Sequence, residues 1–251
     1  MNLFSRLAAT RREDMPASMR IVGMDVPLTL TRNARAKRMS LRLCAASRSI
    51  RIILPPRASL REAQAFAANN AGWLEEQIAR RWPEPAPFVP GADVPFGDGH
   101  LMLEATSARG VQRIGDRLLV NEDALLFASR TTRWLRAHAL LVLDAETRQL
   151  AARIERPVAA VRVGDPSSRW GSCAAGRDNG GGRIAFSWRL IMAPDFVRKA
   201  VVAHEVAHLS EPNHGAGFWQ LATDLLQVSH RPARAWLAQH GPALHAQGVS
   251  R

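Results

Sequence analysis

The first third of the chain has the alternating pattern of a β-sheet. In residues 38–43 apolar residues alternate with Arg and Ser, and a similar alternation occupies Ser49–Leu54, so we expect these two segments to pair as a hairpin. Shorter strand-like segments lie at Ile21–Val22 and Val26–Leu30. Pro55-Pro56 ends the alternation. Residues 1–18 lack the pattern and are predicted to form a flexible tail.

An amphipathic helical pattern follows these strands. Ser59, with Glu62 three residues later, has the spacing of a capping box at the start of a helix. The apolar face of the predicted helix comprises Leu60, Ala63, Phe66, Ala67, Trp73, Leu74 and Ile78. Residues 83–90 contain four prolines and are predicted to be extended. Residues 19–90 are therefore predicted to be a β-rich N-terminal region with helices.

The rest of the chain, residues 91–251, mixes strands with longer helices. Apolar periodicity predicts a long helix from about Asp123 to Ile154. Strands are predicted at His100–Ala105, Arg117–Val120, Val158–Val163 and Arg183–Trp188, and three further helices near residues 195–210, 215–227 and 231–239. This order predicts an α+β fold with a helical C-terminal part, and we expect residues 19–90 to form one compact unit with it.

Composition excludes several classes of protein. The 251 residues are 47% hydrophobic and 22% charged, which is enough to bury a core and excludes a disordered or collagen-like chain. Cys44 and Cys173 are too few for a disulfide scaffold. No apolar run reaches the roughly 18 residues of a membrane span, and the N-terminal residues lack the long apolar segment of a signal peptide. We expect a cytoplasmic protein with no membrane association.

The basic charge is concentrated near the N-terminus. The chain has 34 basic and 22 acidic residues, and residues 1–90 hold 15 of the basic and 7 of the acidic ones. Residues 32–57 contain eight basic and no acidic residues. Such a segment can contact nucleic acid or an acidic protein, although a solvated face and an Arg-rich coding bias are simpler explanations.

The segment from Val201 to Leu209 carries the pattern His-Glu-x-x-His. His204 and His208 lie one helical turn apart, so both imidazoles can reach one Zn²⁺ from the same helix face. Glu205 is placed to take a proton from water rather than to bind the metal. The surrounding valines indicate a buried helix, in which a metal would satisfy these polar side chains.

A catalytic zinc site needs a third protein ligand and leaves one position for water. His214 is the best candidate, because Pro212 and Asn213 favour a turn that returns the chain toward the helix. The alternatives are Glu211, Asp224 and His230.

These residues resemble the signature of the YgjP-like metallopeptidase family, which is related to the SprT zinc peptidases. The resemblance is carried by His204-Glu-Val-Ala-His-Leu-Ser-Glu-Pro-Asn-His, by Ser168-Arg-Trp-Gly-Ser-Cys and by Ile184-Ala-Phe-Ser-Trp. It extends to residues 35–43 and 73–78 and so covers most of the chain. It implies a zincin-like C-terminal region, zinc ligands at His204, His208 and His214, a catalytic Glu205, and a cleft bordered by the strand Arg183–Trp188.

Two departures from the family pattern concern the site. The loop at residues 174–182 is longer than is usual in the family. The family's Pro-x-Tyr is replaced near Ser229-His-Arg-Pro, and the chain contains no tyrosine. His230 or Arg231 are therefore candidates for stabilising the oxyanion in place of a tyrosine hydroxyl.

Other residues are predicted to shape the cleft. Backbone groups of Arg183, Ile184, Ala185 and Phe186 are expected to align a peptide substrate. Ser172 and Cys173 invite a nucleophile hypothesis, but a metal-activated water needs none, so we expect them to support the cleft. Trp188, Phe218 and Trp219 are expected to pack around the site.

The sequence therefore predicts a peptidase that holds one Zn²⁺ per chain and acts on a peptide or protein substrate, with Glu205 as general base. The alternative is a nucleic-acid-associated protein that uses basic residues 32–57 and carries a structural or vestigial metal site.

Overall fold

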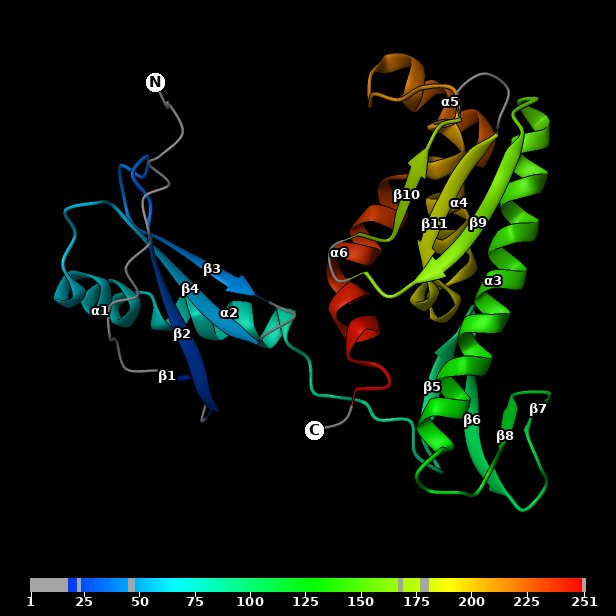
Figure 1. The fold of residues 1–251 in the computed structure, drawn as a ribbon, viewed down its shortest axis with the longest axis horizontal. Helices are drawn as coiled ribbons and strands as arrows, with labels where there is room; N and C mark the ends of the chain where they lie inside the picture. The colour runs from blue at the N-terminus through cyan, green and yellow to red at the C-terminus, as the bar shows by residue number, and fades with distance from the viewer. Residues whose placement is uncertain (1–17, 22–23, 45–47, 167–168, 177–180, 250–251) are drawn as a thin grey trace, which may run out of the picture. The chain divides into compact units, whose positions relative to one another are not determined.

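The computed structural model describes residues 18–21, 24–44, 48–166, 169–176 and 181–249. The predicted tail, except Ser18, lies outside these residues, as do Val22 and part of the long loop that follows Cys173. The chain divides into two compact units, Met1–Pro83 and Glu84–Arg251. Figure 1 shows the elements of each unit, which are described separately below.

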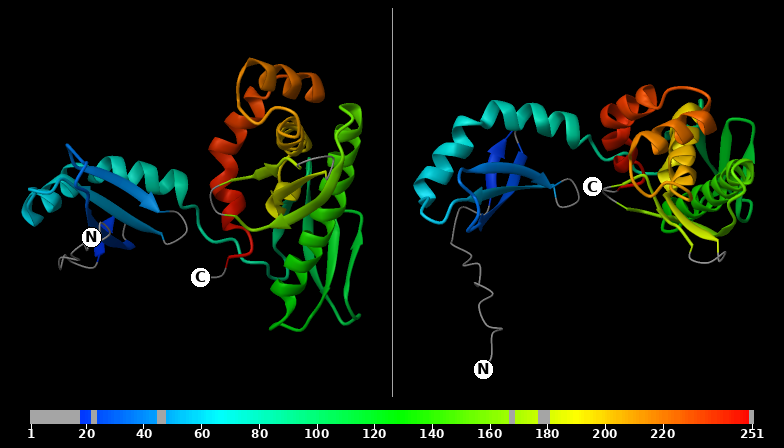
Figure 2. Two further views of the ribbon diagram at one scale, coloured as in Figure 1. Left: turned by 45° about the horizontal axis from the view of Figure 1, so that its top comes forward. Right: turned by 90° about the horizontal axis from the view of Figure 1, so that it is seen from above.

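The first unit is a four-stranded sheet with two helices over one face (Figures 1 and 2). The strands follow the spatial order β1 (Ser18–Ile21), β2 (Met24–Arg32), β4 (Ser49–Leu54) and β3 (Ser40–Cys44). The predicted hairpin is confirmed, because β3 and β4 pair antiparallel, whereas β2 and β4 run parallel. Alternate residues of β4 are fully buried in a core shared with the helices.

The helical segment of this unit begins as predicted but is interrupted. The Ser59 hydroxyl accepts a hydrogen bond from the Glu62 N–H, and the Glu62 carboxylate accepts one from the Ser59 N–H, which forms the predicted capping box. The single helix that was expected is two helices, α1 (Leu60–Asn69) and α2 (Ala71–Arg81). The Asn70 side chain donates to the Phe66 carbonyl, a local bond that competes with helix continuation. Trp73, predicted on the apolar face, is consequently 43% exposed.

The second unit begins with a small sheet in the order β5 (Asp93–Phe96), β6 (Gly99–Thr106), β8 (Arg117–Asn121) and β7 (Val111–Ile114). β6 and β8 confirm the strands predicted at these places, and they run parallel. β5 and β7 were not predicted, because each has only four residues and neither alternates clearly between buried and exposed positions.

The predicted long helix is α3 (Phe127–Arg153), which runs beside a second sheet (Figure 1). Seven of its residues are buried at intervals of four, from Phe127 to Ala151, which gives one continuous stripe toward the core. It begins one turn later than predicted, because the N–H groups of Leu126 and Phe127 bond to the Asp123 carbonyl in a preceding turn. In the second sheet β11 (Gly182–Ser187) lies between β9 (Val158–Gly164) and β10 (Gly171–Ala174).

The remaining helices confirm the predicted helical C-terminal part. They are the 3₁₀ helix η1 (Trp188–Met192), α4 (Asp195–Ala207), α5 (Ala216–Leu226) and α6 (Arg231–Ala246). α4 carries the His-Glu-x-x-His pattern and is the central one, since nine of its 13 residues are buried. None of the described helices is both long enough and apolar enough to span a membrane. The fold class is α+β, as predicted.

Candidate metal centre

Three histidines meet at the C-terminal end of α4. His204 lies in the last turn of the helix, His208 is its C-cap residue, and His214 lies in the loop before α5. One ring nitrogen from each lies within 4.8 Å of the others, and His204 Nε2 is 3.1 Å from His214 Nε2. Two nitrogens bound to one tetrahedral Zn²⁺ lie roughly 3.3 Å apart. The observed spacing therefore fits a single ion.

A tight turn after α4 returns His214 to the helix. The N–H groups of Leu209 and Ser210 bond to the carbonyls of Val206 and Ala207, so the chain curls away from the helix axis before the proline at position 212. α4 consequently ends at Ala207, three residues earlier than predicted. The predicted return of the chain is present, but it begins before the residues that were expected to cause it.

The imidazoles of His204 and His208 are in the protonation states that metal binding needs. His208 Nδ1 lies 2.9 Å from the Glu211 carbonyl oxygen. A nitrogen that faces a carbonyl must donate, which leaves Nε2 of His208 with its lone pair free for a metal. Burial lowers the pKa of His204 to about 4, and the neighbouring His208 and His214 add to this effect. His204 is therefore neutral at pH 7, which is the form that binds metals.

Phe218 of α5 supports all three rings from one side. Its ring centroid lies 4.8 Å from that of His204, 4.4 Å from that of His208 and 4.6 Å from that of His214. Phe218 is fully buried. The ring centroid of Trp219 lies 5.9 Å from the ring centroids of both His204 and His214. The expected packing around the site is confirmed for Phe218 and Trp219, and it limits the freedom of the imidazoles. Trp188 is buried in the core of the same unit.

The alternative third ligands do not join this cluster. The Asp224 carboxylate accepts a hydrogen bond from Gln220, and His230 Nε2 donates to the Ala222 carbonyl. Among the described residues, the group of side chains able to hold a metal contains only the three histidines at positions 204, 208 and 214. The residues that remained open in the sequence, including Glu211, lie outside it.

Glu205 is buried against the backbone of β10. Glu205 is only 6% exposed. A Cβ atom added at Gly171 would lie 2.5 Å from Oε1 of Glu205. Only glycine at position 171 leaves room for the carboxylate in this place. Burial raises the pKa of Glu205 to about 7, and the positive charge of Arg169 partly opposes the shift. Sequence reasoning did not assign this role to Gly171, although the residue lies in the Trp-Gly-Ser-Cys motif.

Cys173 of the same strand is protonated rather than nucleophilic. Burial raises the pKa of its thiol to about 11, and the negative charge of Glu205 adds to the shift. A thiol with this pKa has almost no thiolate at pH 7. The expectation that this residue supports the cleft agrees with these surroundings.

A cavity of about 220 Å³ opens beside His204 and Glu205. Its walls are mostly apolar, with Trp170, Gly171, Ala200, Val201, Ala233 and Leu237, and its polar side chains include His230 and Arg234. Arg231, named with His230 as a candidate oxyanion stabiliser, is exposed and does not line the cavity. Arg234, one helical turn after His230, lines the cavity instead. The helical spacing from His230 was the signal that sequence reasoning missed.

The topology reassigns the strand that can align a substrate. β11, which contains residues 183–186, is the central strand and is paired on both sides. Ile184 and Phe186 are also buried in the core. A central strand has no free edge, so the backbone-pairing role expected for these residues does not agree with the structure. Among the described strands of this sheet, β10 forms the edge on the side of the cavity, and it reaches the cavity at Gly171.

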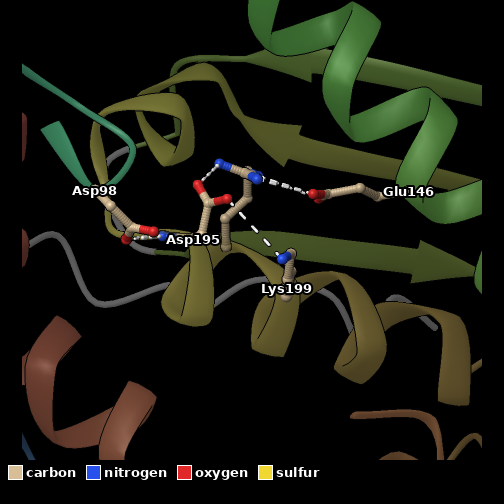
Figure 3. A network of polar contacts seen from close by, with 5 residues as sticks. Asp98, Glu146, Asp195 and Lys199 are labelled. Carbon is tan, nitrogen blue, oxygen red and sulfur yellow. Dashed lines mark hydrogen bonds and ion pairs between the residues drawn. The ribbon is translucent and has the colours of Figure 1, made fainter.

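The start of α4 is fixed by a network of ion pairs (Figure 3). Arg198 is buried, with its guanidinium 2.8 Å from Glu146 of α3 and 2.6 Å from Asp195. The Asp98 carboxylate accepts a hydrogen bond of 2.9 Å from the Asp195 N–H. The first turn of α4 is therefore tied both to α3 and to the turn between β5 and β6.

Comparisons with the curated proteins and with the solved structures found no match. A scan against protein-family models gave a match to the YgjP-like metallopeptidase domain over residues 37–240. The matched span covers well over half of the chain, and it contains the three clustered histidines and Glu205. The chain therefore belongs to the YgjP-like metallopeptidase domain family.

Proposed function

We propose that this metallopeptidase is a zinc enzyme in which His204, His208 and His214 hold one Zn²⁺ and Glu205 is the general base. The observation that carries the proposal is the convergence of three imidazole nitrogens, from α4, its C-cap and the following loop, beside the buried carboxylate of Glu205. Imidazole ligands suit Zn²⁺, and three protein ligands leave one position open, as in catalytic zinc sites. A structural zinc site is closed by a fourth protein ligand, and no such side chain joins the cluster among the described residues.

When bound, Zn²⁺ would polarise the scissile carbonyl and make a water molecule more acidic. The Glu205 carboxylate accepts a proton from the attacking water and returns it to the leaving amine. The pKa of Glu205 is raised to about 7 by burial, and a nearby positive charge favours the ionised form that the base requires.

Arg234 is the better candidate for stabilising the negative charge on the carbonyl oxygen. His230 Nε2 is 3.0 Å from the Ala222 carbonyl and donates its proton there, so a neutral His230 has no second proton to offer. The guanidinium of Arg234 always carries donors, lines the same cavity and lies over the ring of Trp219 at 5.6 Å. We expect Arg234→Met to lower kcat with little change in KM, because the interaction forms only in the transition state.

The edge of β10 is suited to an extended peptide. An added strand would form backbone hydrogen bonds along this edge, which is the general mode of strand addition. Gly171 lies at the cavity and against Glu205, so a peptide bound there would pass close to the proposed base. The apolar walls of the cavity would then receive one side chain of the substrate.

Glu205→Gln tests the role of the base, because the amide has the same shape but cannot accept the proton. We expect the variant to keep its zinc and to lose about 10²- to 10⁴-fold in kcat/KM on a quenched-fluorescent peptide library. Glu211→Gln is the matched control, since its carboxylate is exposed nearby, and it should hydrolyse normally. Unchanged hydrolysis by Glu205→Gln would refute the general-base role, and loss of zinc would make Glu205 a ligand instead.

A further inference from the structure

The sheet of the first unit has one face covered by helices, and no helix or strand among the described residues of this unit covers the other, which we call the open face. The buried residues of β4 alternate with Arg51, which is exposed and therefore projects from the open face. Strand register places Arg42 of β3 directly opposite Arg51, and Thr29 of β2 on the other side of Arg51. Two arginines and a hydroxyl thus form one row across three strands.

The pair of Arg42 and Arg51 is not explained by stability. Both side chains are exposed, and no hydrogen bond or ion pair formed by the described residues involves either side chain. Like charges directly opposite each other on neighbouring strands destabilise a sheet. An anion bound between the two guanidinium groups would remove this repulsion.

Two loops extend the positive charge at one end of the strands. β2 and β4 are parallel and finish at this end, where the antiparallel β3 begins. Residues 33–39 and 55–59 therefore lie side by side. The Asn33 N–H bonds to the Leu54 carbonyl, and the Arg32 guanidinium donates to carbonyls of the second loop. With the two arginines of the open face, the exposed cations of these loops form what we call the basic surface: Arg35, Lys37, Arg38, Arg42, Arg51 and Arg57.

The distribution of acidic residues argues against a coding bias as the source of this surface. Between Asp25 and Glu62 the sequence has nine basic and no acidic residues. Residues 91–160 also have nine basic residues, but they are balanced by nine acidic ones. A bias toward arginine codons would raise arginine in both regions without removing carboxylates from one. The excess therefore belongs to this part of the fold.

We propose that the basic surface binds duplex nucleic acid through its phosphate backbone. Five of its six cations are arginines, whose planar fork binds phosphate oxygens in pairs. A nucleic acid always presents adjacent phosphates to the paired Arg42 and Arg51, whereas a peptide needs a particular acidic sequence. Residues 18–65 contain no aromatic side chain on which unpaired bases could stack, which favours a duplex over a single strand. Contacts to phosphates carry no sequence information, so we expect binding without sequence preference.

The test is binding of the full chain to a fluorescent duplex of about 20 base pairs and mixed sequence, measured by anisotropy between about 50 and 200 mM KCl. We expect the logarithm of the association constant to fall linearly with that of the salt concentration. The double variant Arg42→Gln/Arg51→Gln should bind more weakly and reduce this slope by about 1.8, which is about 0.9 for each lost phosphate contact. The unfolding temperature of this variant should be no lower than that of the wild type, because a repulsive pair of charges is removed.

The matched control is Arg109→Gln/Arg133→Gln, which removes two exposed arginines of the second unit and should leave the slope unchanged. The proposal is overturned if the wild-type chain does not bind the duplex, or if the double variant at positions 42 and 51 keeps the wild-type slope. It is also overturned if polyglutamate of equal charge displaces the duplex as well as unlabelled duplex does, since the surface would then serve acidic proteins. Peptide hydrolysis by the double variant should be unchanged, which separates this result from the zinc-peptidase proposal.

Discussion

In the second unit, two arginines are buried and their charges are matched. Arg198 is held by Glu146 and Asp195, and Arg189 is held by Asp165 and by the carbonyls at the end of α6. Both arginines are only 6% exposed. In the first unit the arginines at positions 42 and 51 are exposed, face each other, and have no carboxylate partner among the described residues.

This difference separates two uses of one residue type. The buried arginines connect elements, and Arg198 fixes the start of the helix that carries His204 and His208. The exposed arginines at positions 42 and 51 form no ion pair with the described residues and present their charge to solvent. The net charge of +12 is therefore not a uniform property of the molecule. It indicates an anionic partner only where the carboxylates are missing.

The largest effect on stability is expected from Arg198→Met. The variant leaves Glu146, whose side chain is 19% exposed, without its guanidinium partner. Breaking a buried pair from one side costs about 3 kcal/mol of unfolding free energy, which urea denaturation of the second unit would measure. The control is Arg133→Met, at an exposed position of α3, the helix that contains Glu146. It should change the free energy of unfolding by less than about 0.5 kcal/mol. Equal stability of the two variants would mean that the buried network is not what holds α4.

Gly171→Ala should affect catalysis more than folding. The new Cβ atom would overlap the Glu205 carboxylate and push it from its place against β10. A displacement of this kind can cost about 100-fold in kcat/KM, while the zinc content stays the same. The control in the first unit is Gly72→Ala, where nothing lies within 4 Å, and it should add about 0.5–1 kcal/mol of stability with normal hydrolysis. Activity of Gly171→Ala within twofold of the wild type would contradict the tight placement of Glu205.

The metal-free second unit should show two opposing pH effects. The pKa of Glu205 is raised to about 7 from 4.5, so its contribution to stability is full below pH 4.5 and is lost as the pH rises through 7. The pKa of His204 is lowered to about 4 from 6.5, so its contribution is present above pH 6.5 and is lost as the pH falls through 4. Between pH 4.5 and 6.5 the contributions of these two residues offset each other in the wild type, whereas His138 and His245, whose pKa values burial also lowers, make stability rise with pH.

Glu205→Gln removes one of these two effects. In the presence of a chelator, its stability should rise with pH between 4.5 and 6.5 more steeply than that of the wild type, by an amount of the order of 1 kcal/mol per pH unit. Thermal unfolding of both proteins at several pH values would measure the difference. A profile parallel to that of the wild type would show that Glu205 does not oppose His204 in this range.

The smallest effect is expected from Arg51→Thr in the first unit. Threonine suits a strand and ends the repulsion with Arg42, so the unit should gain a few tenths of a kcal/mol in urea denaturation. The same variant should bind duplex nucleic acid more weakly. A loss of stability would contradict the view that this arginine is kept for binding rather than for folding.

Features that depend on neighbours in the sequence were predicted well. The capping box of Ser59 and Glu62 and the one-turn spacing of His204 and His208 are local, and the structure contains both. The long α3 helix was also predictable, because its buried positions repeat every four residues over the whole length.

Features that depend on distant contacts were not predictable from the sequence. The central place of β11 is decided by its pairing with both β9 and β10, which no pattern within residues 183–186 reveals. The fit of Gly171 against Glu205 and the place of Arg234 in the cavity join segments far apart in the chain. The sequence made His214 the best candidate for the third ligand but left Asp224 and His230 open, and the hydrogen bonds that hold those two side chains elsewhere are visible only in the structure.

The most direct test of the central claim is the zinc content of the chain, measured by elemental analysis of protein purified without a histidine tag or a chelator. We expect about one zinc per wild-type chain and almost none in His204→Ala or His214→Ala. His230→Gln should keep its zinc, because His230 lies outside the histidine cluster. A wild-type chain that contains no zinc, and takes up none when zinc is added, would contradict the proposal that His204, His208 and His214 hold Zn²⁺.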